Sequence, residues 1–370
     1  MIPVNRPVMD GNEKKYLAEC IDTEWISSEG PFVKRLEDGF AKLCHRKHGI
    51  AVCNGSVAID LAVAALRIGP GDEVILPTFT IVSCAAAVVR AGATPVVVDC
   101  EADTWNMDPA LVASRVTSRT KAIMVVHIYG LPVDMDPILE LARKHDLRII
   151  EDAAEQHGQT YKGRPTGSFG DISTVSFYPN KHITTGEGGM VVTDDDDLAG
   201  RCRSLRNLCF DRERRFIHEE LGWNFRMSNL QAAVGVAQLE RIEQILLKKR
   251  QIGSWYNEAL RESALLRLPV LRTNYAENVY WVFGVVLKED RVAFDASEAI
   301  ARMRAKGVDC RHFFWPTHDQ PAFKNMGLFS GESCPNAEFI ARRGFYLPSG
   351  VGITREEVSA SAEALKQILE

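Results

Sequence analysis

Four short, almost uninterrupted apolar segments alternate with helical segments in the first half of this 370-residue chain. The apolar segments are residues 74–77, 95–99, 122–126 and 147–151, and the helical segments between them are 84–90, 109–116 and 137–145. Strands that are apolar on both faces and joined by helices are typical of a mostly parallel sheet covered by helices. Such sheets bind ligands beyond the carboxyl ends of their strands. The sequence therefore predicts an α/β fold with its site at that edge.

The length of the chain and the order of its segments predict two domains. We expect residues 1–245, which begin with an extended arm at 1–10, to form a large α/β domain. The remaining residues, 246–370, are expected to form a smaller α+β domain. A capping box at residues 228–231 is followed by apolar residues at helical spacing. It predicts one long helix from 230 to about 261, which could bridge the two domains.

The composition disfavours several classes of protein. The formal net charge is -5 and no basic block is longer than three residues, so we expect neither nucleic acid nor a membrane as a partner. No apolar run reaches transmembrane length. The nine cysteines never form Cys-x-x-Cys, which indicates reduced thiols in a cytoplasmic protein and no metal site. No Gly-x-Gly-x-x-Gly follows the first strand, which disfavours a nicotinamide-dinucleotide site.

One lysine lies on a tight turn between two strand candidates. The apolar run 172–177 ends at Pro179 and Asn180, which favour a turn, and Lys181 follows directly. A glycine-rich stretch and a second apolar run, 190–192, come next, so the lysine lies beside backbone that only glycine allows to come close. This placement suits a lysine that reacts. The alternative is the charged tip of a hairpin.

Three further features suit pyridoxal phosphate together with Lys181. Asp152 ends a buried strand, and an anion there can hold the protonated ring nitrogen of this cofactor. Residues 54–56 (Asn-Gly-Ser) lead a short strand into a buried helix, whose N-terminus offers free N–H groups to a phosphate. Ser176 adds a hydroxyl five residues before the lysine. For residues 54–56 the alternative is a simple helix cap.

Four segments carry a resemblance to a known family. They are residues 151–155, 176–181, 184–190 and 224–229. On these segments, and over nearly the whole chain, the sequence resembles the nucleotide-sugar aminotransferases of the DegT/DnrJ/EryC1/StrS family. The resemblance implies the type I fold of PLP-dependent aminotransferases, with a mostly parallel mixed sheet covered by helices in the large domain and a smaller C-terminal α+β domain. It also implies pyridoxal 5′-phosphate as the cofactor.

The resemblance implies a role for each matching residue. Lys181 would bond covalently to the cofactor and later carry the proton between cofactor and substrate carbons. Asp152 would pair with the ring nitrogen, Ala154 would lie against the ring and Glu155 near the ring hydroxyl. The phosphate would be held by Gly55, Ser56, Ser176 and, from the neighbouring subunit, Asn224. The active sites would therefore be shared within a homodimer.

Two positions depart from the family pattern, and the substrate residues are inferred more loosely. Ile81 stands where an aromatic residue usually stacks on the cofactor ring, and Ala86 where asparagine is frequent. Segments that line the sugar pocket in relatives suggest Ser27, Phe314 and His318 as substrate residues. Arg226, on the same loop as Asn224, is a fourth candidate. Each has a structural alternative, such as loop capping, an interface ion pair or core packing. We interpret His127 as structural and Trp281 as a core residue.

The resemblance implies transfer of the amino group of L-glutamate to a 4-keto-6-deoxy nucleotide sugar, with GDP-4-keto-6-deoxy-D-mannose as the first choice. A dTDP- or UDP-linked keto sugar, aminated at C4 or C3, is the alternative substrate. A non-catalytic sensor of nucleotide sugars is the alternative from another class. The reactive lysine argues against a sensor, which would have no need of Lys181, Asp152 and Ser176 together.

Overall fold

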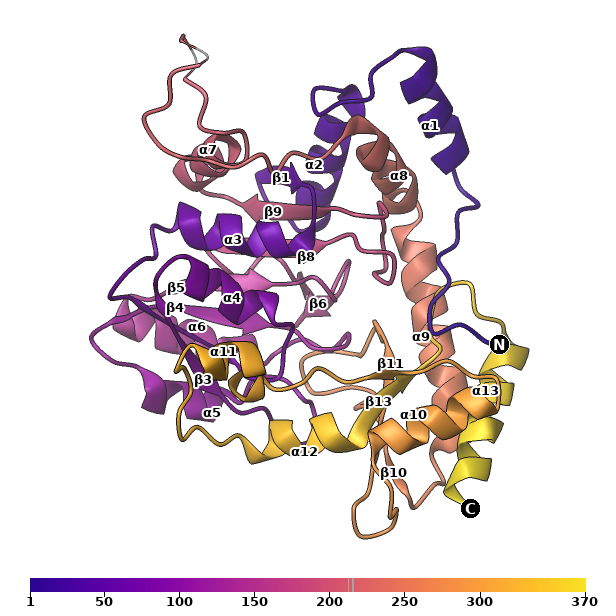
Figure 1. Ribbon diagram of the computed structural model, residues 1–370. Helices are drawn as coiled ribbons and strands as arrows, with labels where there is room; N and C mark the ends of the chain where they lie inside the picture. The colour runs from indigo at the N-terminus through magenta and orange to yellow at the C-terminus, as the bar shows by residue number, and fades with distance from the viewer. Residues whose placement is uncertain (212, 215) are drawn as a thin grey trace.

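A seven-stranded sheet forms the centre of the larger part of the molecule in the computed structural model, which describes residues 1–211, 213–214 and 216–370 (Figure 1). Its strands, in spatial order, are β1 (His48–Val52), β9 (Gly189–Thr193), β8 (Ile172–Ser176), β5 (Arg148–Asp152), β4 (Thr120–Val126), β2 (Glu73–Pro77) and β3 (Thr94–Val98). Five neighbouring strands, from β8 to β3, pair in parallel, and β9 runs antiparallel to both of its neighbours. The expected mostly parallel mixed sheet is confirmed.

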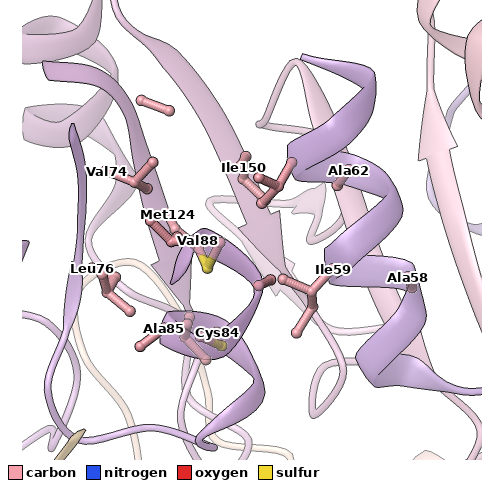
Figure 2. Packing of buried hydrophobic residues seen from close by; sticks show 14 of the residues in the cluster. Ala58, Ile59, Ala62, Val74, Leu76, Cys84, Ala85, Val88, Met124 and Ile150 are labelled. Atoms are coloured by element: carbon pink, nitrogen blue, oxygen red, sulfur yellow. The ribbon is translucent and has the colours of Figure 1, made fainter. Parts of the chain in front are cut away.

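Helices cover both faces of this sheet because its strands are apolar on both faces. One face packs against α3 (Gly55–Ala65), α4 (Ser83–Arg90) and α7 (Asp196–Leu205). Figure 2 shows Ile59 of α3 and Val88 of α4 in this layer, beside Met124 of β4. Next to Met124 in the strand, Ile123 faces the opposite way and packs with α6 (Met135–His145). This alternation is the two-residue period of a strand.

The remaining elements complete the larger part of the fold. At the end of the sheet formed by β8, β9 and β1, the second face packs against α1 (Glu13–Asp22), α2 (Pro31–Leu43) and α8 (Asn229–Leu239). Short elements connect the others: α5 (Pro109–Val112), η1 (Ala113–Arg115), β6 (Thr160–Tyr161) and β7 (Arg164–Pro165). The helix predicted from 109 to 116 is therefore a short α-helix followed by a 3-10 turn.

A second, antiparallel sheet of four strands forms the smaller part. Its strands, in spatial order, are β10 (Leu266–Arg267), β11 (Phe283–Leu287), β13 (Gly344–Leu347) and β12 (Arg311–His312). The helices beside it are α9 (Ile242–Leu260), α10 (Ala296–Ala305), α12 (Pro335–Arg343) and α13 (Arg355–Leu369). Between β12 and α12 the chain also forms η2 (Thr317–Asp319) and α11 (Pro321–Asn325), and Phe323 of α11 packs in the core of the large sheet. We propose that the domain boundary lies within α9, because Leu246 packs in the core of the large sheet and Tyr256 in that of the small one.

One local prediction is wrong, for a non-local reason. The single helix expected from 230 to 261 is two helices, α8 and α9, broken at Glu240 and Arg241. At this break Glu240 accepts hydrogen bonds from Tyr16 and from Arg35, contacts that a periodicity does not record. Arg241, at the same break, forms an ion pair with Asp10, and Asn12 stands at the cap position of α1. In the smaller part, β11 begins at Phe283, three residues after the left-handed Tyr280 (φ 52°).

The N-terminal arm is extended, as expected, and is tied to both parts of the molecule. Ile2 pairs with Val308, and the carbonyl of Val4 accepts from the N–H of Ser349 at 3.1 Å. Asn5 reaches the larger part, where its Nδ2 donates to the carbonyl of Pro179 at 2.9 Å. The arm therefore connects the small sheet to the turn that carries Lys181.

The cysteines are all free thiols in the structure. All nine lie among the described residues, where none forms a disulfide. Eight are buried, and Cys53, which follows β1, is partly exposed. In the described part of the chain, no helix combines the length and the apolarity that crossing a membrane requires.

Candidate active site

The predicted site residues meet where the strands of the large sheet end. A cavity of about 640 Å³ opens at this edge. Nine of the residues singled out in the sequence line it: Gly55, Ser56, Ile81, Asp152, Ala154, Glu155, Ser176, Lys181 and Phe314. Because β1, β2, β5 and β8 all end at this edge, and β9 begins there, the topology brings these distant segments together.

Lys181 lies on the connection between β8 and β9. The backbone closes on itself here, since the N–H of Phe177 donates to the carbonyl of Gly188 at 2.8 Å and the N–H of Lys181 to that of Tyr178 at 2.9 Å. The lysine side chain is only 10% exposed, and its Nζ lies 3.3 Å from Oε1 of Glu155. The turn therefore holds a partly buried amine beside a carboxylate inside the cavity, rather than at a solvated hairpin tip.

Two buried carboxylates lie near this amine. Asp152, the last residue of β5, is 2% exposed, and burial raises the pKa of its carboxyl above its ordinary value. Its Oδ1 accepts from the N–H of Ala154 at 3.0 Å, and the thiol of Cys84 donates to its Oδ2 at 3.5 Å. Burial also raises the pKa of Glu155 from 4.5 to about 7. These contacts fix both carboxylates in the wall of the cavity.

The carboxylate of Glu155 is held by an unusual backbone. The N–H of Tyr129, just beyond β4, donates to Oε2 of Glu155 at 2.8 Å. Tyr129 is left-handed (φ 55°), a conformation that costs free energy in a non-glycine residue. Its hydroxyl accepts from the N–H of Phe314 at 3.1 Å, which brings that residue to the same cavity. The N–H of the strained Tyr129 and the amine of Lys181 therefore both hold the carboxylate of Glu155 in place.

The start of α3 offers a place for an anion. Asn54 caps this helix, and its side chain accepts from the N–H of Val57 at 3.0 Å. A Cβ on Gly55 would lie 2.6 Å from Cβ of Ser176, so only glycine fits between the two segments. The hydroxyl of Ser56 lies 2.7 Å from that of Ser83. A helix N-terminus with serine hydroxyls beside it suits a phosphate.

These residues fit pyridoxal 5′-phosphate. The cradle at Gly55 offers N–H and hydroxyl donors to a phosphate, Asp152 offers a buried anion to a cationic ring nitrogen, and Lys181 offers an amine to the aldehyde. Ile81, at the mouth, is 42% exposed and leaves the cavity open toward solvent, whereas Ala86 packs with the sheet core. Among the described residues, no group of three or more His, Cys, Asp or Glu side chains could hold a metal ion.

Four other predicted residues do not line this cavity. Asn224 accepts from Nε of Arg226 at 3.0 Å, and Nη1 of Arg226 donates to Asn207 at 2.6 Å. Ser27 is exposed, and its carbonyl accepts from the N–H of Asn229. His318 is buried elsewhere: its Nδ1 lies 2.6 Å from Oγ1 of Thr78 and its Nε2 lies 3.2 Å from Oε1 of Glu338.

His127 and three residues for which the sequence suggests no part in the site complete the description. His127 is buried against Glu151 at 3.0 Å, in keeping with its structural interpretation. Trp281, expected in the core, is 4% exposed but also forms a wall of the cavity beside Lys181. Ser83 and Cys84, at the start of α4, were not singled out in the sequence. No local pattern marks any of these three, since their contacts come from elements distant in the chain.

Comparison with protein families and curated sequences gives one consistent result. The model of the DegT/DnrJ/EryC1/StrS aminotransferase family matches residues 7–366. A GDP-perosamine synthase of Caulobacter vibrioides is 44% identical over 371 residues, covering 100% of this chain and 98% of the relative. A GDP-perosamine synthase of Escherichia coli O157:H7 is 38% identical, covering 99% of this chain and 98% of that one.

Solved structures agree with the sequence comparison. An aminotransferase from Psychrobacter cryohalolentis superposes with a TM-score of 0.92 at 30% identity, covering 98% of this chain and 97% of that chain. DesV of S. venezuelae, solved in complex with a ketimine intermediate, superposes with a TM-score of 0.88 at 34% identity, covering 97% of this chain and 94% of that chain. The agreement extends over both sheets.

Proposed function

Since the chain belongs to the DegT/DnrJ/EryC1/StrS aminotransferase family, we propose that it transfers the amino group of L-glutamate to C4 of GDP-4-keto-6-deoxy-D-mannose, giving GDP-perosamine. The enzymes of this family are PLP-dependent sugar aminotransferases, so the chain is a transaminase. The choice of sugar is supported by the relatives named GDP-perosamine synthase, at 38–44% identity. The observation that carries the proposal is the amine of Lys181 beside Glu155 in a cavity that also holds Asp152 and a phosphate cradle.

Each residue of the cavity has a task in this proposal. Pyridoxal 5′-phosphate, when bound, supplies an electron sink for the carbon that loses or gains a proton. Asp152 would hold the cationic ring nitrogen, and Glu155 would accept from or donate to the ring hydroxyl. Lys181 would bond to the cofactor and then move a proton with its Nζ. Side chains at the cavity, Ala154 and Ile81, would cover the two faces of the ring.

The phosphate and the substrate would be held by the remaining residues. Gly55 and Ser56, at the N-terminus of α3, and Ser176 would bind the cofactor phosphate. Phe314 lines the cavity and would contact the sugar. Three residues outside the cavity are also proposed to contact substrate: Ser27, Arg226 and His318.

We also propose a homodimer whose two active sites are shared. Asn224 lies outside the cavity of its own chain, so it would serve the phosphate site of a neighbouring subunit. Exposed apolar side chains beside it, Leu221 and Trp223, and at the cavity mouth, Ile81 and Tyr178, support a covered surface here. The unbridged cysteines favour a reducing, cytoplasmic location.

The absorption spectrum of the PLP-loaded protein tests the proposed reaction. We expect a visible band from cofactor bonded to Lys181, its loss when L-glutamate is added, and its return when GDP-4-keto-6-deoxy-D-mannose follows. The variant Lys181→Ala should show neither the band nor turnover. Return of the band with a dTDP- or UDP-linked keto sugar, but not with the GDP sugar, would replace the proposed substrate and leave the reaction class standing. Absence of the band in the wild type would contradict the reaction itself.

A further inference from the structure

Trp281 makes two separate contacts with the turn that carries Lys181. Its indole Nε1 donates to the carbonyl of Asn180 at 2.8 Å, the residue just before the lysine. The Nζ of Lys181 lies 3.7 Å from the centroid of the indole ring. Trp281 belongs to the segment that leads into β11 of the small sheet, a hundred residues further along the chain. One side chain thus contacts both the backbone of the turn and the amine.

The position of Trp281 is itself fixed on several sides. Tyr280, just before it, is left-handed (φ 52°), and the N–H of Tyr280 donates to Oδ1 of Asn278 at 2.7 Å. The backbone at 280–281 lies so close to Gly130 that a Cβ there would be 2.6 Å from the nitrogen of Trp281. The buried ammonium of Lys249 donates to the carbonyl of Trp281 at 2.7 Å. These contacts fix the backbone from which the indole of Trp281 extends.

The contact suits the charged form of the lysine. An ammonium over an aromatic face is attracted by the quadrupole of the ring, and the attraction strengthens where water is excluded. Lys181 is 10% exposed and Trp281 is 4% exposed, so water is largely excluded from the pair. A lysine has four rotatable side-chain bonds and loses much conformational freedom when it is held. The indole face and the carboxylate of Glu155 together restrict where its Nζ lies.

We propose that Trp281 is a positioning residue for Lys181: its N–H holds the turn at Asn180, and its ring holds the amine where the cofactor aldehyde must meet it. This proposal rests on the proposed function only in the role of Lys181. It predicts that loss of the indole releases the amine, which becomes more reactive toward small reagents in solution and less able to capture pyridoxal phosphate. A side chain that only fills the core would move neither rate in this opposed way.

Two labelling rates of the cofactor-free protein test the proposal. The first is acylation of Lys181 by acetic anhydride, measured by peptide mass spectrometry relative to the exposed Lys162. The second is capture of pyridoxal phosphate at Lys181, trapped with borohydride at successive times. The variants are Trp281→Leu, which loses ring and N–H, and Trp281→Phe, which keeps a ring and loses the hydrogen bond. The matched control is Trp255→Leu, because Trp255 stacks with Lys248 (Nζ 4.4 Å from the ring) away from the cavity.

We expect Trp281→Leu to slow capture about tenfold or more and to raise acylation about threefold or more, since one hydrogen bond and one cation–π contact are lost. Trp281→Phe should show a smaller change in the same directions. Thermal denaturation shows whether each variant is folded, and Trp281→Phe keeps the test decisive if Trp281→Leu is not. In turnover, the variants should lose kcat while KM for glutamate is kept. The proposal would be overturned if both variants kept both rates within about twofold of the wild type. A twofold change corresponds to less free energy than one hydrogen bond contributes.

The acylation rate separates this proposal from the proposed function. If the wild type acylates slowly at Lys181 but never captures pyridoxal phosphate, the proposed function fails. The effect of Trp281→Leu on acylation still decides whether the indole positions the amine.

Discussion

Glu155 and Asp152 are two carboxylates that share a single lysine in the wall of one cavity. Burial raises the pKa of both above its ordinary value, and the charge of the nearby Lys181 opposes this rise. Asp152 is bonded to Ala154 and Cys84, whereas Glu155 faces the amine directly. The environments of the two acids therefore differ although the residues are three apart, and this difference suits two tasks: a fixed anion and a group that holds a proton near neutral pH.

The pKa of Glu155 makes a prediction about stability. Because the folded pKa (about 7) is above the ordinary 4.5, the proton stabilises the folded form below pH 4.5, and this stability is lost as pH rises to about 7. The unfolding free energy of the cofactor-free wild type should fall over this window by on the order of 1–3 kcal/mol from this group. In Glu155→Gln the unfolding free energy should decrease less over this pH range, as urea titrations at several pH values would show. Asp136→Asn, at an exposed carboxylate, serves as the control, and equal slopes in wild type and Glu155→Gln would contradict the assignment.

At the scale of elements, the sequence predicted what local chemistry determines. The four apolar strands, the helices between them and the capping box of α8 all follow from periodicity and from residues within one turn. Lys181 and Asp152 could be predicted because strand ends of a parallel sheet meet at one edge. The break between α8 and α9 could not be predicted, because it depends on hydrogen bonds from α1 and α2 to Glu240. Trp281 could not either, because only the packing of the small sheet brings it to Lys181.

Two helices carry the same capping box, and only one of them lies near the site. Ser228 caps α8 with Gln231, whose Nε2 also donates to the carbonyl of Glu187 at 2.8 Å, in the loop after Lys181. Thr354 caps α13 in the same way, in the smaller part of the molecule. We expect Ser228→Ala and Thr354→Ala each to lower the unfolding free energy by about 1 kcal/mol. Only Ser228→Ala should also weaken binding of pyridoxal phosphate, measured by fluorescence titration. Equal affinity in both variants would show that the cap and the loop are not coupled.

At the scale of the whole molecule, two sheets and an extended arm meet around one turn. The arm ties the small sheet, at Ser349, to Pro179, and Trp281 ties the same sheet to Asn180. One connection comes from the N-terminal arm and the other from the segment before β11, and they contact consecutive residues. The position of Lys181 therefore depends on how the larger and smaller parts are joined, and not only on the hairpin that carries it. A change in that junction should therefore move the amine of Lys181.

The proposed sharing of active sites between two subunits predicts that two inactive variants can complement each other. Lys181→Ala and Asn224→Ala should each be inactive or weak alone, but denaturing and refolding them together should recover about a quarter of wild-type activity, since half of the dimers are mixed and each mixed dimer has one intact site. The control pairs Lys181→Ala with Asp152→Asn, two residues proposed to act in the same chain. That mixture should recover nothing. Equal recovery in both mixtures, or none in either, would show that Asn224 does not serve a neighbouring subunit.

The partly exposed Cys53 offers an attachment point for a probe of ligand binding and assembly. The other eight thiols are buried, so a maleimide dye should attach once to the folded protein and nine times after denaturation. The attachment point precedes Asn54, the cap of α3, and its N–H is bonded to the carbonyl of Phe225, next to Asn224. A fluorophore placed there reports from between the phosphate cradle and the segment proposed to face a second subunit. Ligand binding and assembly could then be followed in real time without any engineered residue.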